Sequence, residues 1–179
     1  MLHLFLADGF EEIEALATVD VLRRCGLDVQ TVSVTDEIIV EGAHGVSVVA
    51  EELLESVDVT DSEALILPGG MPGAETLCNT PKLQEMLKSH AAKGGLCCAI
   101  CAAPMMLGKL GLLNGRRATC YPGFEDHLAG AEYTAAPVEE DGHFITANGP
   151  AAAVDFACAI GKRLGANVEN VRKGMMYRA

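Results

Sequence analysis

Cys101 is the residue of this chain whose surroundings most clearly predict chemistry. It follows the short apolar run Leu96-Cys97-Cys98-Ala99-Ile100 and precedes two small helix-forming residues, Ala102 and Ala103. A cysteine at a sharp turn from strand to helix projects its sulfur outward, and the following backbone N–H groups point toward that sulfur. The positive end of the helix dipole favours a thiolate, so we expect a thiol pKa well below the ordinary ~8.5. The sequence therefore predicts a reactive thiol.

Two other segments carry groups that such a thiol could use. Glu14 lies in the first turns of an expected helix. A carboxyl that turns toward a crevice and is partly desolvated has a raised pKa and can hold a proton for a thiolate or carbonyl. Helix position alone favours a simpler role, in which the acid offsets the helix dipole. Gly69 and Gly70 follow an apolar strand. The two glycines could simply allow a tight turn there. Alternatively, the Gly70 N–H could stabilise an oxyanion.

The remaining sulfur and nitrogen ligands form no recognisable redox or metal motif. Cys98 and Cys101 have C-x-x-C spacing, but three strand steps of about 3.3 Å place their Cα atoms roughly 10 Å apart, beyond the ~7 Å limit for a disulfide. The sequence contains no H-E-x-x-H and no nucleotide-binding glycine motif, so we expect neither a metal nor an organic cofactor. A Cys-His hydrolase would need a histidine beside Cys101, and His127 stays a candidate.

Composition limits the class of protein. The 179 residues are 50% hydrophobic and 21% charged, which is typical of one compact domain spanning residues 1–179. The net charge of −12 argues against stable nucleic-acid binding. Seven cysteines at irregular spacings inside apolar runs suit a reducing cytoplasm. The first residues lack a basic segment, so we expect no signal peptide, and no apolar stretch reaches the roughly 18 residues of a membrane span.

Short apolar runs alternate with helical segments along the chain, which predicts an α/β fold with a mostly parallel sheet and helices on both faces. The loops after Ala7, Leu67 and Ile100 should meet at the carboxyl edge of that sheet. Two inserts, Ile38 to Val49 and Tyr133 to Ala147, are expected to be β-hairpins. The expected strands are 2–7, 28–34, 64–67 and 95–100, and the expected helices are 11–25, 81–93, 102–110 and a final long one from Pro150 to about Leu164.

Five segments together resemble one known superfamily. They are Gly9 to Glu14, Asp20 to Arg24, Leu67 to Ala74, Ala99 to Pro104, and Asn148-Gly149-Pro150. These segments are similar to those of the ThiJ/PfpI superfamily, in the branch of the Parkinson's-associated protein deglycase and bacterial YajL. The resemblance implies a class I glutamine amidotransferase-like domain, a flavodoxin-like three-layer sandwich and a homodimer.

The resemblance also implies roles for particular residues. Cys101 matches the family's oxidation-sensitive nucleophile, and Glu14 matches its protonated partner carboxyl. The backbone N–H groups of Gly70 and Ala102 match the oxyanion donors, with Gly69 adjacent to the site. Arg24 matches an arginine near the site at the dimer interface.

The chain departs from the family pattern at three positions. The protease-like and chaperone-hydrolase branches have histidine directly after the nucleophile, whereas this chain has Ala102, which disfavours proteolysis. The deglycase branch has a histidine before proline in a nearby loop, and Tyr121 stands there in this chain. Tyr121 could bond a substrate oxygen, but a tyrosine titrates near pH ~10 and is a poor proton shuttle at neutral pH. Ala103 stands where that branch often has glycine.

These features lead to two hypotheses about function. In the first, the chain is a cysteine-dependent enzyme of carbonyl stress, either a deglycase of glycated proteins or nucleotides or a glutathione-independent glyoxalase. The Cys101 thiolate attacks a carbonyl carbon of methylglyoxal or its early adducts, and Glu14 moves protons. In the second, the chain is a non-catalytic oxidative-stress sensor or chaperone that works through oxidation of Cys101. The sequence leaves both open.

Overall fold

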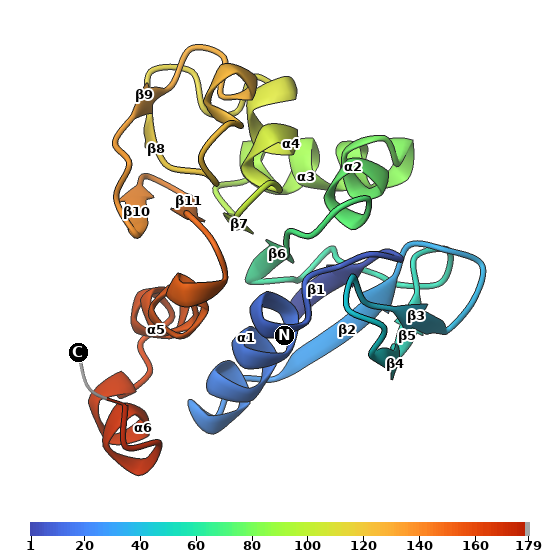
Figure 1. Ribbon diagram of the computed structural model, residues 1–179, viewed down its shortest axis with the longest axis vertical. Helices are drawn as coiled ribbons and strands as arrows, with labels where there is room; N and C mark the ends of the chain where they lie inside the picture. The colour runs from blue at the N-terminus through green and yellow to red at the C-terminus, as the bar shows by residue number, and fades with distance from the viewer. Residues whose placement is uncertain (178–179) are drawn as a thin grey trace.

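The apolar runs build one central sheet in the computed structural model, which describes residues 1–177. Its seven strands follow the order β10-β11-β7-β6-β1-β2-β5, and every neighbouring pair is parallel except β10 with β11 (Figure 1). Two small sheets, β3-β4 and β8-β9, lie outside it. The strands are β1 Leu2–Leu6, β2 Val29–Ser33, β3 Ile39–Glu41, β4 Ser47–Val49, β5 Glu52–Leu53, β6 Ala64–Leu67, β7 Leu96–Ile100, β8 Arg117–Ala118, β9 Glu132–Tyr133, β10 Val138–Asp141 and β11 Phe144–Ala147.

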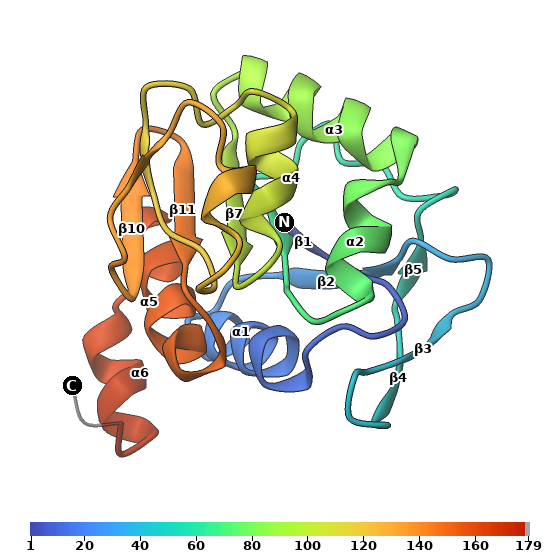
Figure 2. The same ribbon diagram turned by 45° about the horizontal axis from the view of Figure 1, so that its top comes forward.

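Helices cover both faces of the sheet. Helices α1 and α5 pack on one face and α2, α3 and α4 on the other, so the molecule has three layers (Figure 2). The flavodoxin-like sandwich is therefore confirmed. No helix within residues 1–177 is both long enough and apolar enough to cross a membrane. The helices are α1 Glu12–Arg24, α2 Gly73–Cys78, α3 Pro81–Ala92, α4 Pro104–Lys109, α5 Ala153–Arg163 and α6 Val168–Gly174, with short 3₁₀ turns η1 Glu125–His127 and η2 Pro150–Ala152.

The strands β6 and β7 are apolar along their whole length because both of their faces are covered. In β7, Cys98 and Ile100 join the core beneath α1 and α5. Cys97 and Ala99 join the core beneath α2, α3 and α4. The expectation that Cys97 and Cys98 are small core residues on opposite faces is confirmed.

Several expected boundaries were wrong. The hairpin expected between Tyr133 and Ala147 is confirmed as β10 and β11, but it is shorter than expected and completes the central sheet beside β7, while Tyr133 belongs to β9. The last expected helix ends at Arg163, within one residue of the expected end, and Gly165 follows with a positive φ of 83°. Its first residues, Pro150–Ala152, form a 3₁₀ turn, and the helix α6 after it was not expected. The helix α2 was not expected, because it begins at Gly73, within the glycine- and proline-rich loop expected after Leu67.

Two buried histidines are expected to make the fold sensitive to acid. His3 in β1 and His90 in α3 are 2% and 6% exposed, and burial lowers the pKa of each below the ordinary 6.5. Protons then bind the unfolded chain more tightly than the folded one, so stability is full above about pH 6.5 and falls as the pH drops toward the folded pKa values. Urea unfolding between pH 5 and 8 should show this slope, and His3→Gln with His90→Gln should flatten it. An equal slope in the double variant would contradict the assignment.

Candidate active site

Cys101 sits at the turn that the sequence predicted. It has a φ of 65°, in the left-handed region that non-glycine residues rarely adopt, and follows the last residue of β7. Its N–H donates to Ala147 O at 2.8 Å, and its carbonyl accepts from Tyr121 N–H at 2.8 Å. Helix α4 begins at Pro104 rather than at Ala102, because residues 101–103 form a turn before it. The backbone on both sides of the thiol is thus held firmly in a strained conformation.

Two backbone amides face the sulfur. The N–H groups of Ala102 and Gly70 both donate hydrogen bonds to the Cys101 sulfur, and each bond works to lower the thiol pKa. Gly70 has a φ of 90°, which turns its amide toward the thiol, and a side chain there would meet the backbone of residues 9–11. The same two donors could bind an oxygen that becomes negative during a reaction at the sulfur.

Glu14 completes the group of side chains around the thiol. It lies in the first turn of α1, is 0% exposed, and its Oε2 accepts from the Gly69 N–H at 2.7 Å. The Cys101 thiol lies close enough for each group to shift the pKa of the other, and Glu14 Oε1 is buried without a hydrogen-bond partner among the described residues. Gly69 fills the space between the two side chains: a Cβ on Gly69 would lie 2.6 Å from Cys101 Cβ and 2.7 Å from Glu14 Oε2. The site therefore requires glycine at position 69.

The expectation that the Cys101 thiol has a lowered pKa is wrong, because the thiol shares protons with Glu14. Burial, with a smaller contribution from the nearby Glu11 carboxylate, raises the pKa of Glu14 to about 7. Burial and the charge of Glu14 raise the pKa of Cys101 to about 12, against the lowering effect of the two amides. Two negative charges cannot both form at this distance inside the protein. A thiolate therefore exists when the shared proton rests on Glu14.

Glu11 and Glu12 have roles that sequence analysis missed. Glu11 is the N-cap of α1, and its Oε2 accepts from the Glu14 N–H at 2.7 Å. Glu12 accepts from the His44 backbone N–H at 2.6 Å and bonds the His44 ring at 2.7 Å, which fastens the β3-β4 turn to α1. The Glu11-x-x-Glu14 spacing, which resembles a capping box, was the available signal for the cap. No local pattern links Glu12 to His44.

The same three side chains are candidate ligands for a metal ion. Glu11, Glu12 and His44 place one ligand atom each within 4.8 Å of one another. Both oxygens of Glu12 already accept hydrogen bonds, and Glu11 is engaged as a helix cap. We interpret the group as a clamp that holds the hairpin beside the active-site helix.

Tyr121 is beside the thiol through its backbone. Its N–H bonds the Cys101 carbonyl, while the side chain is 46% exposed and packs near Gly149. The position matches the expected place beside the site, and the exposed phenol could meet a substrate. The same loop brings Cys120 into the core beneath α2, α3 and α4.

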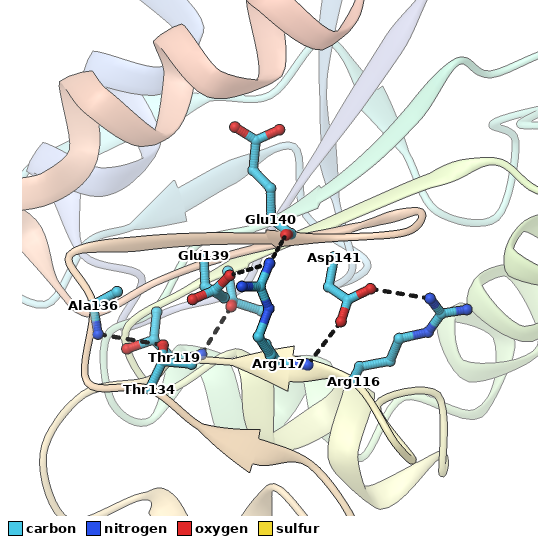
Figure 3. Close-up of polar contacts among 9 residues, drawn as sticks. Arg116, Arg117, Thr119, Thr134, Ala136, Glu139, Glu140 and Asp141 are labelled. Atoms are coloured by element: carbon cyan, nitrogen blue, oxygen red, sulfur yellow. Dashed lines mark hydrogen bonds and ion pairs between the residues drawn. The ribbon is translucent and has the colours of Figure 1, made fainter.

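A network of charged residues anchors the strand that precedes Tyr121 (Figure 3). Arg116 Nη1 donates to Asp141 Oδ1 at 3.1 Å, and the Arg117 backbone N–H donates to Asp141 Oδ2 at 2.9 Å. Arg117 also pairs with Glu139 at 3.2 Å, and Thr119 N–H bonds the Thr146 hydroxyl at 2.9 Å. These contacts tie β8 to the β10-β11 edge of the sheet and so hold the Tyr121 loop over Cys101.

Arg24 and His127 do not reach the thiol within one chain. Arg24 is in the last turn of α1, ten residues beyond Glu14 and therefore about 15 Å along the helix axis. It is exposed and pairs with Asp20 at 2.7 Å. His127 is in η1, where its ring lies 5.9 Å from the ring of Phe124. Within residues 1–177, the groups that shift the pKa of Cys101 are Glu14 and two amides, and no histidine is among them.

Comparison with known proteins gives one family. The model of the DJ-1/PfpI family matches residues 2–163. Protein DJ-1 homolog B of Arabidopsis thaliana is 42% identical over 163 residues, which are 89% of this chain and 37% of the plant protein. The chain thus spans well under half the length of that relative. A solved structure of oxidized Toxoplasma gondii DJ-1 superposes with a TM-score of 0.95 at 35% identity, covering 99% of this chain and 98% of the other.

Two relatives carry names that state an activity. A glutathione-independent glyoxalase of Caenorhabditis elegans is 36% identical over 84% of this chain and 80% of its own length. A deglycase of Pyrococcus abyssi is 33% identical over 80% of this chain and 87% of its own length.

Proposed function

The chain belongs to the DJ-1/PfpI family, and from that premise we propose that it is a cysteine-dependent enzyme of carbonyl stress. Its substrate is a small reactive dicarbonyl such as methylglyoxal, or the early adduct of that compound on a protein or nucleotide. The observation that carries the proposal is the buried Glu14 carboxyl, which accepts from the Gly69 amide and lies beside the Cys101 thiol across Gly69. A proton donor is thereby fixed beside a nucleophile. The cytoplasm is the proposed location.

The geometry suits the following sequence of steps. The Cys101 thiolate forms a bond to the aldehyde carbon of methylglyoxal, and the carbonyl oxygen takes the proton of Glu14, which gives a hemithioacetal. The Gly70 and Ala102 amides hold the oxygen while it is negative. Glu14, now a carboxylate, removes the hydrogen from the former aldehyde carbon and returns it to the neighbouring carbon, while the hydroxyl proton on the former aldehyde carbon passes to the ketone oxygen, which gives the lactoyl thioester. Water then hydrolyses the lactoyl thioester, so that methylglyoxal and water become lactate.

Turnover of methylglyoxal tests this proposal. Wild type is expected to form many equivalents of lactate per chain without glutathione, and Cys101→Ala is expected to form none. Cys78→Ala, which changes another buried thiol, should retain wild-type turnover. Lactate of both enantiomers would be measured over time at equal protein concentration. If wild type shows no turnover while Cys101 alone oxidises under mild peroxide, the enzyme is excluded and the sensor function is supported.

The proposed assembly is a homodimer built on α1 and the β3-β4 hairpin. These elements expose large apolar side chains, including Ile13 at 58%, Val46 at 49% and Val49 at 68%. A second copy of the chain is the occupant that would cover them, and it would place Arg24 near the interface. Light scattering during gel filtration should give the mass of a dimer for wild type and of a monomer for Ile13→Glu. Met176→Glu, which charges an exposed residue after α6, is the matched control, and a monomeric wild type would contradict the proposal.

A further inference from the structure

A second thiol, Cys158 in α5, lies in a charged cluster remote from the Cys101 turn. Arg172 of α6 donates a hydrogen bond to the Cys158 sulfur and pairs with the Asp155 carboxylate. The Tyr177 hydroxyl donates to the same carboxylate at 2.9 Å, and the guanidinium lies 5.2 Å from the Tyr177 ring centroid. These contacts raise the pKa of Arg172 above its ordinary value, so the cation persists.

Cys158 is shielded by the protein but borders a cavity. The side chain is 4% exposed, and it lines a hollow of about 250 Å³ between α5 and α6. Lys162 and Arg172 contribute cations to the lining, and Asp155 and Glu169 contribute carboxylates. The volume is several times that of a water molecule, so a small polar oxidant can reach the sulfur.

Another thiol, Cys25, directly follows α1 and lies close to this cluster. It caps the C-terminus of α1, which lies beside α5 in both ribbon views (Figures 1 and 2). Its Sγ packs against α5 so closely that a Cβ on Gly161 would lie 3.2 Å away. Cys158 precedes Gly161 by three residues, and residues at that spacing are neighbours about 5–6 Å apart on a helix surface. The charge of Cys158, added to burial, raises the pKa of Cys25, which agrees with their proximity.

We propose that Cys158 and Cys25 form a redox pair that a hydroperoxide converts to a disulfide joining α1 to α5. The Cys158 sulfur, beside Arg172, attacks one oxygen of hydrogen peroxide; the O–O bond breaks, sulfur is oxidised to sulfenic acid, and the second oxygen leaves as water with the thiol proton. The Cys25 sulfur then attacks Cys158, the S–O bond breaks, and the hydroxide leaves with the Cys25 proton as a second water. Two thiols and one peroxide give one disulfide and two waters.

The pair is tested in the full chain carrying Cys101→Ala, so that loss of the proposed enzyme activity does not affect the result. After treatment with hydrogen peroxide and alkylation of free thiols, peptide mapping without reduction should find a Cys25–Cys158 cross-link and a mass lower by two hydrogen atoms. With Cys25→Ala added, dimedone should label Cys158 as sulfenic acid. With Arg172→Met added, the cross-link should form more slowly at equal peroxide.

Matched variants separate this proposal from general thiol oxidation. Adding Cys78→Ala should leave the cross-link unchanged, because Cys78 lies in the core beneath α2, α3 and α4. Adding Cys158→Ala should abolish it and leave Cys25 open to alkylation. Full alkylation of both Cys25 and Cys158 after peroxide treatment, or a disulfide that joins other cysteines, would overturn the proposal.

Discussion

Gly69→Ala is expected to abolish turnover while leaving a folded protein. The new Cβ would stand 2.6 Å from Cys101 Cβ and 2.7 Å from Glu14 Oε2, so the nucleophile and the proton donor must move apart. Displacing reacting groups by about 1 Å costs ~100-fold in rate, and we expect at least that loss in kcat/KM. Overpacking of this kind costs about 1–3 kcal/mol of stability. Lactate formation and urea unfolding measure the two effects.

A second glycine provides the control for this variant. Gly174 at the end of α6 has no heavy atom within 4 Å of the place where a Cβ would stand, so Gly174→Ala should keep both activity and stability. Neither Gly69 nor Gly174 has a positive φ, so the comparison isolates steric space from backbone strain. Wild-type activity in Gly69→Ala would show that the thiol and carboxyl need not be in contact.

Glu14→Gln is expected to cost ~100 to 10,000-fold in turnover, which is the usual contribution of a positioned acid and base. The amide can still donate a hydrogen bond to sulfur, but it cannot give or accept a proton. Alkylation of Cys101 by iodoacetamide, which needs no such proton transfer, should change far less. Parallel measurement of lactate formation and alkylation separates the two roles of the carboxyl.

The pH dependence of activity and of Cys101 alkylation should change shape in Glu14→Gln. Below the Glu14 pKa of about 7 the wild-type pair holds two protons and the thiol is neutral, so activity and alkylation rise as the pH passes through about 7. Above that pH the pair keeps one proton, because the charge of Glu14 raises the pKa of Cys101 to about 12. In Glu14→Gln the limb near pH 7 should disappear, leaving the ionisation of the thiol alone. An unchanged limb would assign it to another group.

Local sequence patterns were sufficient for the central part of the fold. Largely apolar strands such as Leu2–Leu6 and Leu96–Ile100 are long enough to identify, and their burial on both faces follows from helices on either side. Helix α2 escaped prediction, because it begins inside a glycine- and proline-rich segment that is typical of a loop. The pairing of β11 with β7 also escaped, since strand order depends on contacts between distant segments.

The chain by itself determined which groups of the site could react. The strand that ends at Cys101, the glycines after β6 and the carboxyl in the first turn of α1 follow from residue type and spacing, and the parallel topology brings their loops to one edge. Only the tertiary structure decided how these groups share charge. Burial is a property of the packed core, and it raises the pKa of both Glu14 and Cys101, whereas the sequence predicted a helix terminus that lowers the thiol pKa. The Glu12–His44 clamp and the neighbouring Cys25 and Cys158 likewise depend on packing between segments far apart in the chain, which no local pattern records.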